Sequence, residues 1–459
     1  MTPKKTIPLF RYTVLPLCLA FLFLTPYAGT AQEAAPSPLN NAAALYKDRK
    51  YRDLQNYLNQ ILPVLKGNDR SKALLYLGYS NDRLKNKAAA AEIFKKAGED
   101  RSVSGRHRTE AWLAYAKMAE RSGESPGSAY WKILEISGGN PNHREAARQY
   151  FQTIASKSAV PVRPGATETY VENNNYFGLS TRNAAVLFNR RTGLPAALWS
   201  SKRTDNLLNN DATNMPFWEL RFNNAAGENR SVDSLETAEV HYKFLKSPAA
   251  PGLKIIYTLN TPPVKGEVTV TVRCPADSSF PEMTVAFTNR NQGLRLWELD
   301  FPKLALCPSG KPEDNQVVFP WRRGRLWPLE RFQQPNTQEY PGSSARFQFI
   351  ALYGKLSGTY FSSLDNSGCE KIFREFYNPA ANLFAVTVTQ FPSGRGTPGN
   401  SITLPYSYKL GGFEGDWYDA ARIYRQWWQQ QPWAARGPLA FNKEVPEWLK
   451  KAPVFLRFY

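Results

Sequence analysis

One short stretch of this chain combines two tryptophans with several arginines. It contains Trp321, Arg322, Arg323, Arg325 and Trp327. An aromatic ring can stack on the apolar C–H face of a sugar, and a guanidinium can make two parallel hydrogen bonds to an anionic group. The stretch therefore predicts a binding site for a carbohydrate, with an anionic polysaccharide as the favoured kind. The alternative is an interdomain packing loop whose arginines are solvated.

The sequence lacks the motifs typical of metal sites, serine hydrolases and nucleotide-binding proteins. The histidines are His107, His143 and His241, which are scattered along the chain without the HExxH spacing of a zinc site, and no CxxC pair occurs. The sequence also has no GxSxG elbow, P-loop or dinucleotide-binding fingerprint. We therefore expect no metal and no cofactor.

Residues 1–31 have the pattern of a secretory signal peptide. A basic start with Lys4 and Lys5 precedes the apolar run 14–24, and small residues at 28–31 offer a cleavage site. The apolar run is about half the ~20 residues that a membrane-spanning helix needs. We therefore expect export to the periplasm or the cell exterior, and no stable membrane span.

The charge balance is strongly basic. Lysine and arginine number 58 against 39 aspartates and glutamates, which gives a formal net charge of +19. Removal of the signal peptide would lower the charge to about +16, because three basic residues leave with it. In an exported protein this excess favours an anionic polysaccharide over nucleic acid as partner. The remaining cysteines, Cys274, Cys307 and Cys369, allow at most one disulfide, and the sequence leaves open whether one forms.

The elements that would position these residues fall into successive segments. Residues 40–157 are rich in Ala, Leu, Lys and Glu with helical spacing, and Pro and Gly mark a linker at 158–166. From 167 to 412 the apolar period changes to two, as in Val268, Val270 and Val272. Such a long run of strand patterns without a long helix predicts a large antiparallel β-sandwich.

Within the helical segment, two helix pairs resemble tetratricopeptide repeats (TPR). In the clearer pair, small and large residues have the spacing that lets two helices pack closely. These residues are Leu74, Leu77, Gly78, Ala90, Phe94 and Ala97. The resemblance implies a concave surface for a protein partner, so an extracytoplasmic scaffold acting through residues 40–157 is the alternative function. The other interpretation is a helical cap packed on the next domain.

Two further segments follow the strands. Residues 413–445 predict a connector helix with apolar residues on one face, which are Trp417, Ala420, Ala421, Tyr424, Trp427 and Trp428. This face could be buried between two domains or could stack on a sugar. Residues 446–459 predict a short helix and then the apolar run 454–459, which reads as a buried strand without its neighbours. We expect the chain to be truncated inside a domain there.

Several stretches resemble one family in the order in which they occur. Three resemble the start of a galactose-mutarotase-like β-supersandwich, and two resemble glycoside-hydrolase-like proteins related to endo-α-N-acetylgalactosaminidases. They are residues 176–179, 188–198 and 216–220, followed by 340–349 and 358–365. The resemblance implies a multidomain α + β protein whose sandwich precedes a (β/α)8 barrel, with 454–459 as its first strand.

The resemblance also implies site residues. Tyr340, Gln348 and Asp365 match motif positions of the family and are candidate carbohydrate contacts, although structural roles in a turn and at a strand edge fit them equally well. The two catalytic carboxylates of such enzymes would come from barrel strands after Tyr459, so we assign no catalytic residue. We therefore expect an exported glycoside-hydrolase-like protein, not catalytic as it stands, that binds carbohydrate or supports the barrel.

Overall fold

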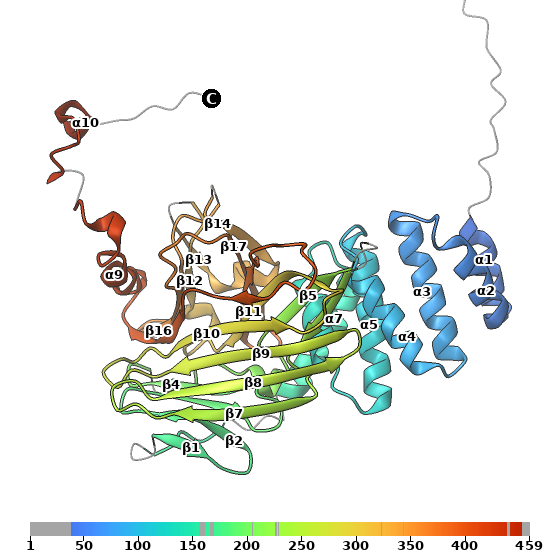
Figure 1. Ribbon diagram of the computed structural model, residues 1–459, viewed down its shortest axis with the longest axis horizontal. Helices are drawn as coiled ribbons and strands as arrows, with labels where there is room; N and C mark the ends of the chain where they lie inside the picture. Colours follow the sequence, from blue (N-terminus) through green and yellow to red (C-terminus); the bar gives the residue numbers. More distant parts are fainter. Residues whose placement is uncertain are drawn as a thin grey trace, which may run out of the picture.

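The computed structural model describes residues 38–155, 161–165, 169–203, 205–224, 227, 229–322, 324–342, 344–437 and 441–451. The expected signal peptide, parts of the expected linker and the apolar run 454–459 lie outside these ranges. A row of helices at one end is followed by stacked sheets and then by two further helices (Figure 1). The predicted order of helices followed by large antiparallel sheets is confirmed.

The helical part consists of seven consecutive helices in the described chain, each packed against the next. They are α1 (Pro38–Lys47), α2 (Tyr51–Ile61), α3 (Gly67–Arg83), α4 (Lys87–Glu99), α5 (Gly105–Ser122), α6 (Gly127–Glu135) and α7 (Pro141–Ala155). Gly78 permits the close approach of α3 and α4, because a Cβ there would lie 2.5 Å from the Phe94 ring. The small and large residues predicted to meet in this pair therefore do meet.

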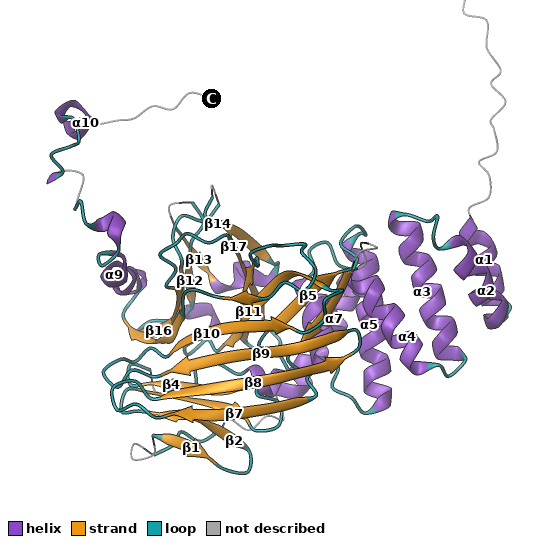
Figure 2. Cartoon of the chain, viewed as in Figure 1, coloured by secondary structure: helices purple, strands orange, loops and turns teal. Residues whose placement is uncertain are grey.

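The strands form three sheets, and every strand pairing in the described residues is antiparallel (Figure 2). A four-stranded sheet contains β1 (Tyr170–Glu172), β2 (Tyr176–Ser180), β3 (Ala184–Asn189) and β4 (Pro195–Ser200). A six-stranded sheet has the order β14 (Asn336–Tyr340), β17 (Lys371–Asn378), β18 (Leu383–Gln390), β11 (Arg295–Leu306), β5 (Glu219–Asn223) and β6 (Asn229–Asp233).

The third sheet is ten-stranded. Its order is β13 (Arg325–Pro328), β12 (Gln316–Phe319), β15 (Phe349–Tyr353), β16 (Ser357–Ser363), β20 (Tyr408–Glu414), β10 (Glu282–Asn289), β9 (Val264–Arg273), β8 (Gly252–Thr261) and β7 (Glu239–Leu245), with β19 (Ile402–Thr403) paired to β10. Short helical turns connect some strands: α8 (Asn210–Thr213), η1 (Pro312–Asp314) and η2 (Leu329–Gln333).

The six-stranded sheet separates the main core from the helices. Its strands alternate, so Leu220 and Phe222 on β5 face the core shared with the ten-stranded sheet, whereas Glu219 and Arg221 face the other way. Helices α4 to α7 cover that second face. A separate apolar cluster, in which Trp131 and Phe151 of the helices meet Phe376 of β17, joins the two parts.

The predicted connector helix is α9 (Trp417–Trp428), and Asp416 caps it through a capping box with Asp419. Its apolar face is only partly covered in the described chain: Ala420 is buried, but Trp417 and Trp428 are 46% and 42% exposed. The chain continues through η3 (Pro432–Ala434) to α10 (Glu447–Lys451), which lies away from the sheets (Figure 1).

Candidate functional site

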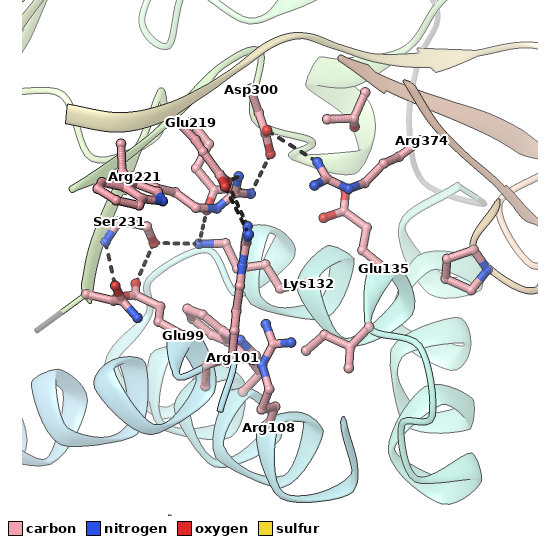
Figure 3. Close-up of a pocket in the computed structure, with 18 of the residues that line it drawn as sticks. Glu99, Arg101, Arg108, Lys132, Glu135, Glu219, Arg221, Ser231, Asp300 and Arg374 are labelled. Carbon is pink, nitrogen blue, oxygen red and sulfur yellow. Dashed lines mark hydrogen bonds and ion pairs between the residues drawn. The ribbon is translucent and has the colours of Figure 1, made fainter. Parts of the chain in front are cut away.

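A cavity of about 440 Å³ lies between the helices and the outer face of the six-stranded sheet. Its walls come from α4, α5 and α6 on one side and from β5, β6, β11, β17 and β18 on the other. Figure 3 shows charged side chains from both sides directed toward this space. The volume falls within the range of about 300–1,000 Å³ typical of small-molecule sites.

The strand side of the cavity is organised around Arg221. Its Nη1 donates to Glu298 Oε2 at 3.0 Å, and its Nη2 donates to Asp300 Oδ2 and lies 3.5 Å from Glu219 Oε2. All four side chains point out of the same face of the sheet. Arg221 is paired directly with Glu298 and Glu219 with Asp300, and directly paired residues on neighbouring strands share a face. One guanidinium thus holds three carboxylates together.

The surroundings keep Asp300 ionised. Burial by itself would raise the pKa of this carboxyl, but Arg221 and Arg374 outweigh burial and lower the pKa from 3.8 to about 2. The same balance lowers the pKa of Glu219 well below its ordinary value, with Arg221 and Lys132 as the main opposing charges. These two carboxylates therefore act as fixed anions near neutral pH.

The helix side of the cavity supplies charged groups that pair with the strand side. Arg101, which follows α4, donates to both carboxylate oxygens of Glu298 at 3.1 and 2.9 Å. Lys132 of α6 lies 3.3 Å from Glu219 Oε1 and donates to Ser231 Oγ at 3.2 Å. Glu99 accepts from the Ser231 backbone N–H at 3.1 Å, and burial raises its pKa. These contacts fix the helices on the sheet and also line the cavity (Figure 3).

The cavity also has aromatic and unpaired polar groups. Trp297 lines it and is 38% exposed, with the Arg395 guanidinium 4.3 Å from the centre of its ring. The Oε1 atom of Glu135 is buried and has no hydrogen-bond partner among the described residues. Such groups suit a ligand that offers both C–H faces and hydroxyl donors.

The sequence-predicted aromatic and basic stretch forms a local stack elsewhere. The Trp321 and Trp327 rings lie 5.8 Å apart, and the Arg325 guanidinium lies 4.6 Å from the centre of the Trp321 ring. Both tryptophans pack partly against the sandwich core, whereas Arg322 and Arg325 are exposed. Arg323 lies outside the described residues.

The three residues carried over from the family motif meet in the interior around Lys371. The Lys371 ammonium donates to Asp365 Oδ2 at 2.5 Å and to Gln348 Oε1 at 3.0 Å, and it lies 4.7 Å from the centre of the Tyr340 ring. The side chains of Lys371 and Asp365 are 0% exposed. Gln348 and Asp365 are buried and Tyr340 is partly exposed, and the sequence did not single out Lys371. Carbohydrate contact for these three residues stays a prediction.

A second hollow of about 700 Å³ lies beside α9 and is mostly apolar. It is lined by Phe347 and Phe349 near β15, by Tyr424 and Trp428 of α9, and by Arg325 of β13. The apolar stripe predicted for the connector helix therefore forms one wall of this groove.

Metal sites, disulfides and membrane-spanning helices can be examined in the described ranges. No group of three or more His, Cys, Asp or Glu side chains is arranged to hold a metal ion there, and Cys274, Cys307 and Cys369 are free thiols. None of the helices in these ranges combines the length and apolar character that crossing a membrane requires.

The residues of the charged cavity were missed at the sequence level. The only available signal was charge at strand positions on the face away from the main core, such as Glu219 and Arg221 on β5 and Glu298 and Asp300 on β11. Alternation by itself cannot distinguish a solvated face from one covered by helices.

Comparison with known proteins gives limited similarity. The family described as "Domain of unknown function (DUF6259)" matches residues 402–458. A search of curated proteins gives no match.

Solved structures similar to the chain include glycosidases. The α-N-acetylgalactosaminidase NagBb from Bifidobacterium bifidum, in its GalNAc complex, is 10% identical with a TM-score of 0.42, and the match covers 55% of this chain and 38% of that one. The GH36 α-galactosidase AgaB from Geobacillus stearothermophilus is 12% identical with a TM-score of 0.37, covering 54% and 41%. The chain thus matches about two-fifths of the length of these proteins. Similarity at this level identifies neither a shared site nor a shared reaction.

Proposed function

We propose that this chain is the exported, carbohydrate-binding part of a glycoside-hydrolase-like protein, and that the charged cavity between helices and sheet is its binding site. The N-terminal pattern of a basic start, an apolar run and small residues supports export. The ordered family-like stretches support the glycoside-hydrolase-like relationship. The cavity supports carbohydrate as the ligand.

The observation that carries the proposal is the mixture of groups around one space. Carboxylates, guanidiniums and the half-exposed ring of Trp297 line the same cavity of about 440 Å³. Sugars use all three kinds of partner, since their hydroxyls donate and accept hydrogen bonds and their C–H faces stack on aromatic rings. Glu219 and Asp300 are held as anions in ion pairs, which suits them to accept hydrogen bonds rather than to donate a proton.

The remaining segments receive supporting roles in this proposal. The TPR-like helices serve as a cap, because charged residues of α4 and α6 pair with the sheet and its connections. Lys132 pairs with Glu219 of β5, and Lys95 pairs with Glu236 in the turn after β6.

A glycan array followed by titration calorimetry tests the proposed site. We expect at least one glycan to bind, and Trp297→Ala to weaken that binding about tenfold through loss of the stacking surface. Trp433→Ala is the matched control, since Trp433 is similarly exposed at 46% but does not line the cavity. A correctly folded protein that binds no glycan would overturn the proposal, and equal losses in the two variants would move the site away from the cavity.

A further inference from the structure

We propose that the charged cavity contains a subsite for an anionic group of the ligand, a carboxylate or a sulfate ester, and that Arg108 of α5 is the residue that binds it. This inference rests on the carbohydrate-binding function proposed above and narrows the ligand to acidic glycans.

The first support is the charge balance of the walls. Six basic side chains line the cavity against five acidic ones, and Lys303 lies directly behind Glu135 and Glu219. The basic ones are Arg101, Arg108, Lys132, Arg221, Arg230 and Arg374. A cavity with excess positive charge and low-dielectric walls concentrates anions.

The second support is that Arg108 stands apart from the ion pairs. Arg101 and Arg221 share Glu298, and Arg374 lies 3.5 Å from Asp300 Oδ1. Arg108 forms no ion pair with a carboxylate anywhere in the described part of the chain, and its Nε donates to the Gly98 carbonyl at 2.9 Å. That bond orients the guanidinium and leaves its terminal nitrogens as donors.

The electrostatic surroundings of Arg108 also favour the binding of an anion. Burial, together with the like charges of Arg101 and Arg221, lowers the pKa of Arg108 to about 10. A cation placed among other cations is destabilised, and an arriving anion relieves that destabilisation. The planar guanidinium can hold both oxygens of a carboxylate or two oxygens of a sulfate.

Other groups that line the same cavity complement the rest of such a ligand. Glu135 Oε1, buried without a partner among the described residues, is an acceptor suited to a sugar hydroxyl. Trp297 offers a stacking face at the same cavity. An anionic sugar would therefore find an arginine, an acceptor and an aromatic ring together.

The test compares wild type and Arg108→Gln on an array of neutral, carboxylated and sulfated glycans, with Arg106→Gln as the control. Arg106 lies two residues away on the same helix and is exposed, so this control makes the same charge change outside the cavity. We expect acidic glycans to bind best, Arg108→Gln to weaken them about tenfold, and Arg106→Gln to leave them within twofold. Arg108→Lys, which keeps the charge but loses the two-pronged contact, should fall between.

The outcomes separate this inference from the proposed function. Binding of neutral glycans alone, or acidic binding that is equally strong in Arg108→Gln, overturns the anionic subsite and leaves carbohydrate binding intact. Failure to bind any glycan overturns the proposed function itself. Sodium sulfate, titrated alone and as a competitor of the acidic glycan, tests whether the bound anion belongs to a glycan. Displacement of the acidic glycan by millimolar sulfate supports the subsite. Sulfate binding without acidic-glycan binding overturns the glycan as the ligand of this subsite. Urea unfolding of each variant shows whether a loss reflects misfolding.

Discussion

Two clusters of buried charge in this protein use similar chemistry in different surroundings. Around Lys371, one ammonium is enclosed by Asp365, Gln348 and two tyrosine rings, and the paired side chains are 0% exposed. Around Arg221, one guanidinium joins three carboxylates, but the cluster lines a cavity with the exposed Arg101 and Trp297 beside it.

The comparison separates a structural use of charge from a binding one. In the Lys371 cluster every partner comes from the protein, so it fixes the connection between the Tyr340 turn, the Asp365 loop and β17. In the cavity cluster the protein supplies more basic than acidic groups, and polar atoms such as Glu135 Oε1 have no hydrogen-bond partner among the described residues. A cluster that is complete stabilises the fold, whereas one that is incomplete is suited to a ligand.

The largest expected effect on stability comes from the cluster around Lys371. Lys371→Met removes the ammonium and leaves the Asp365 carboxylate buried without its cation, which should cost about 3–5 kcal/mol of unfolding free energy. Urea unfolding measures this cost, and the double variant Lys371→Met/Asp365→Leu should recover part of it. A loss of unfolding free energy below about 1 kcal/mol would show that the Lys371 cluster contributes little to the stability of the fold.

Arg221→Met should have a smaller effect, of about 2–3 kcal/mol. The reason is that Arg101 still pairs with Glu298 and Arg374 still lies beside Asp300, so the carboxylates keep other cations. The same urea experiment compares the two variants. A loss of unfolding free energy equal to or larger than that of Lys371→Met would mean that the Arg221 cluster stabilises the fold as strongly as the Lys371 cluster does.

Acid should weaken the cavity cluster through Asp300. Because its pKa falls from 3.8 to about 2 on folding, its contribution of about 2 kcal/mol is present above pH 4 and is lost as the pH falls through 2. Asp300→Asn should therefore destabilise the protein by about 2 kcal/mol at pH 6, and the difference from wild type should shrink toward pH 2. Unfolding curves at several pH values test this, and a pH-independent difference would contradict the assignment.

The smallest effect is expected outside both clusters, in the stretch that sequence reasoning favoured. Arg325 is exposed and stacks on Trp321, so Arg325→Ala should change stability by less than about 1 kcal/mol. If the cavity is the glycan site, this variant and Trp321→Ala should keep glycan affinity within about twofold of wild type. A large loss of binding in both folded variants would instead favour the Trp321–Trp327 stretch as the site.

Local patterns predicted the elements well where they depend on neighbours in sequence. The helical spacing of Gly78 and Phe94 anticipated a close helix pair, and the alternation of Val268, Val270 and Val272 anticipated a strand with one buried face. The Trp417–Trp428 face was expected to be buried or to bind sugar, and it forms one wall of a half-open apolar groove. The sequence could not specify how much of that face other segments cover.

The amino-acid sequence by itself determined the order of helices and antiparallel strands, the basic balance and the residues that form each strand face, because these follow from local spacing and composition. Only the tertiary structure decided which charges meet. Arg101 and Glu298 are far apart along the chain, as are Lys132 and Glu219, and they pair because helices α4 to α6 pack on one face of the six-stranded sheet. Among the described residues, the same packing left Arg108 without an ion pair, since pairing depends on distances in space that no local pattern encodes.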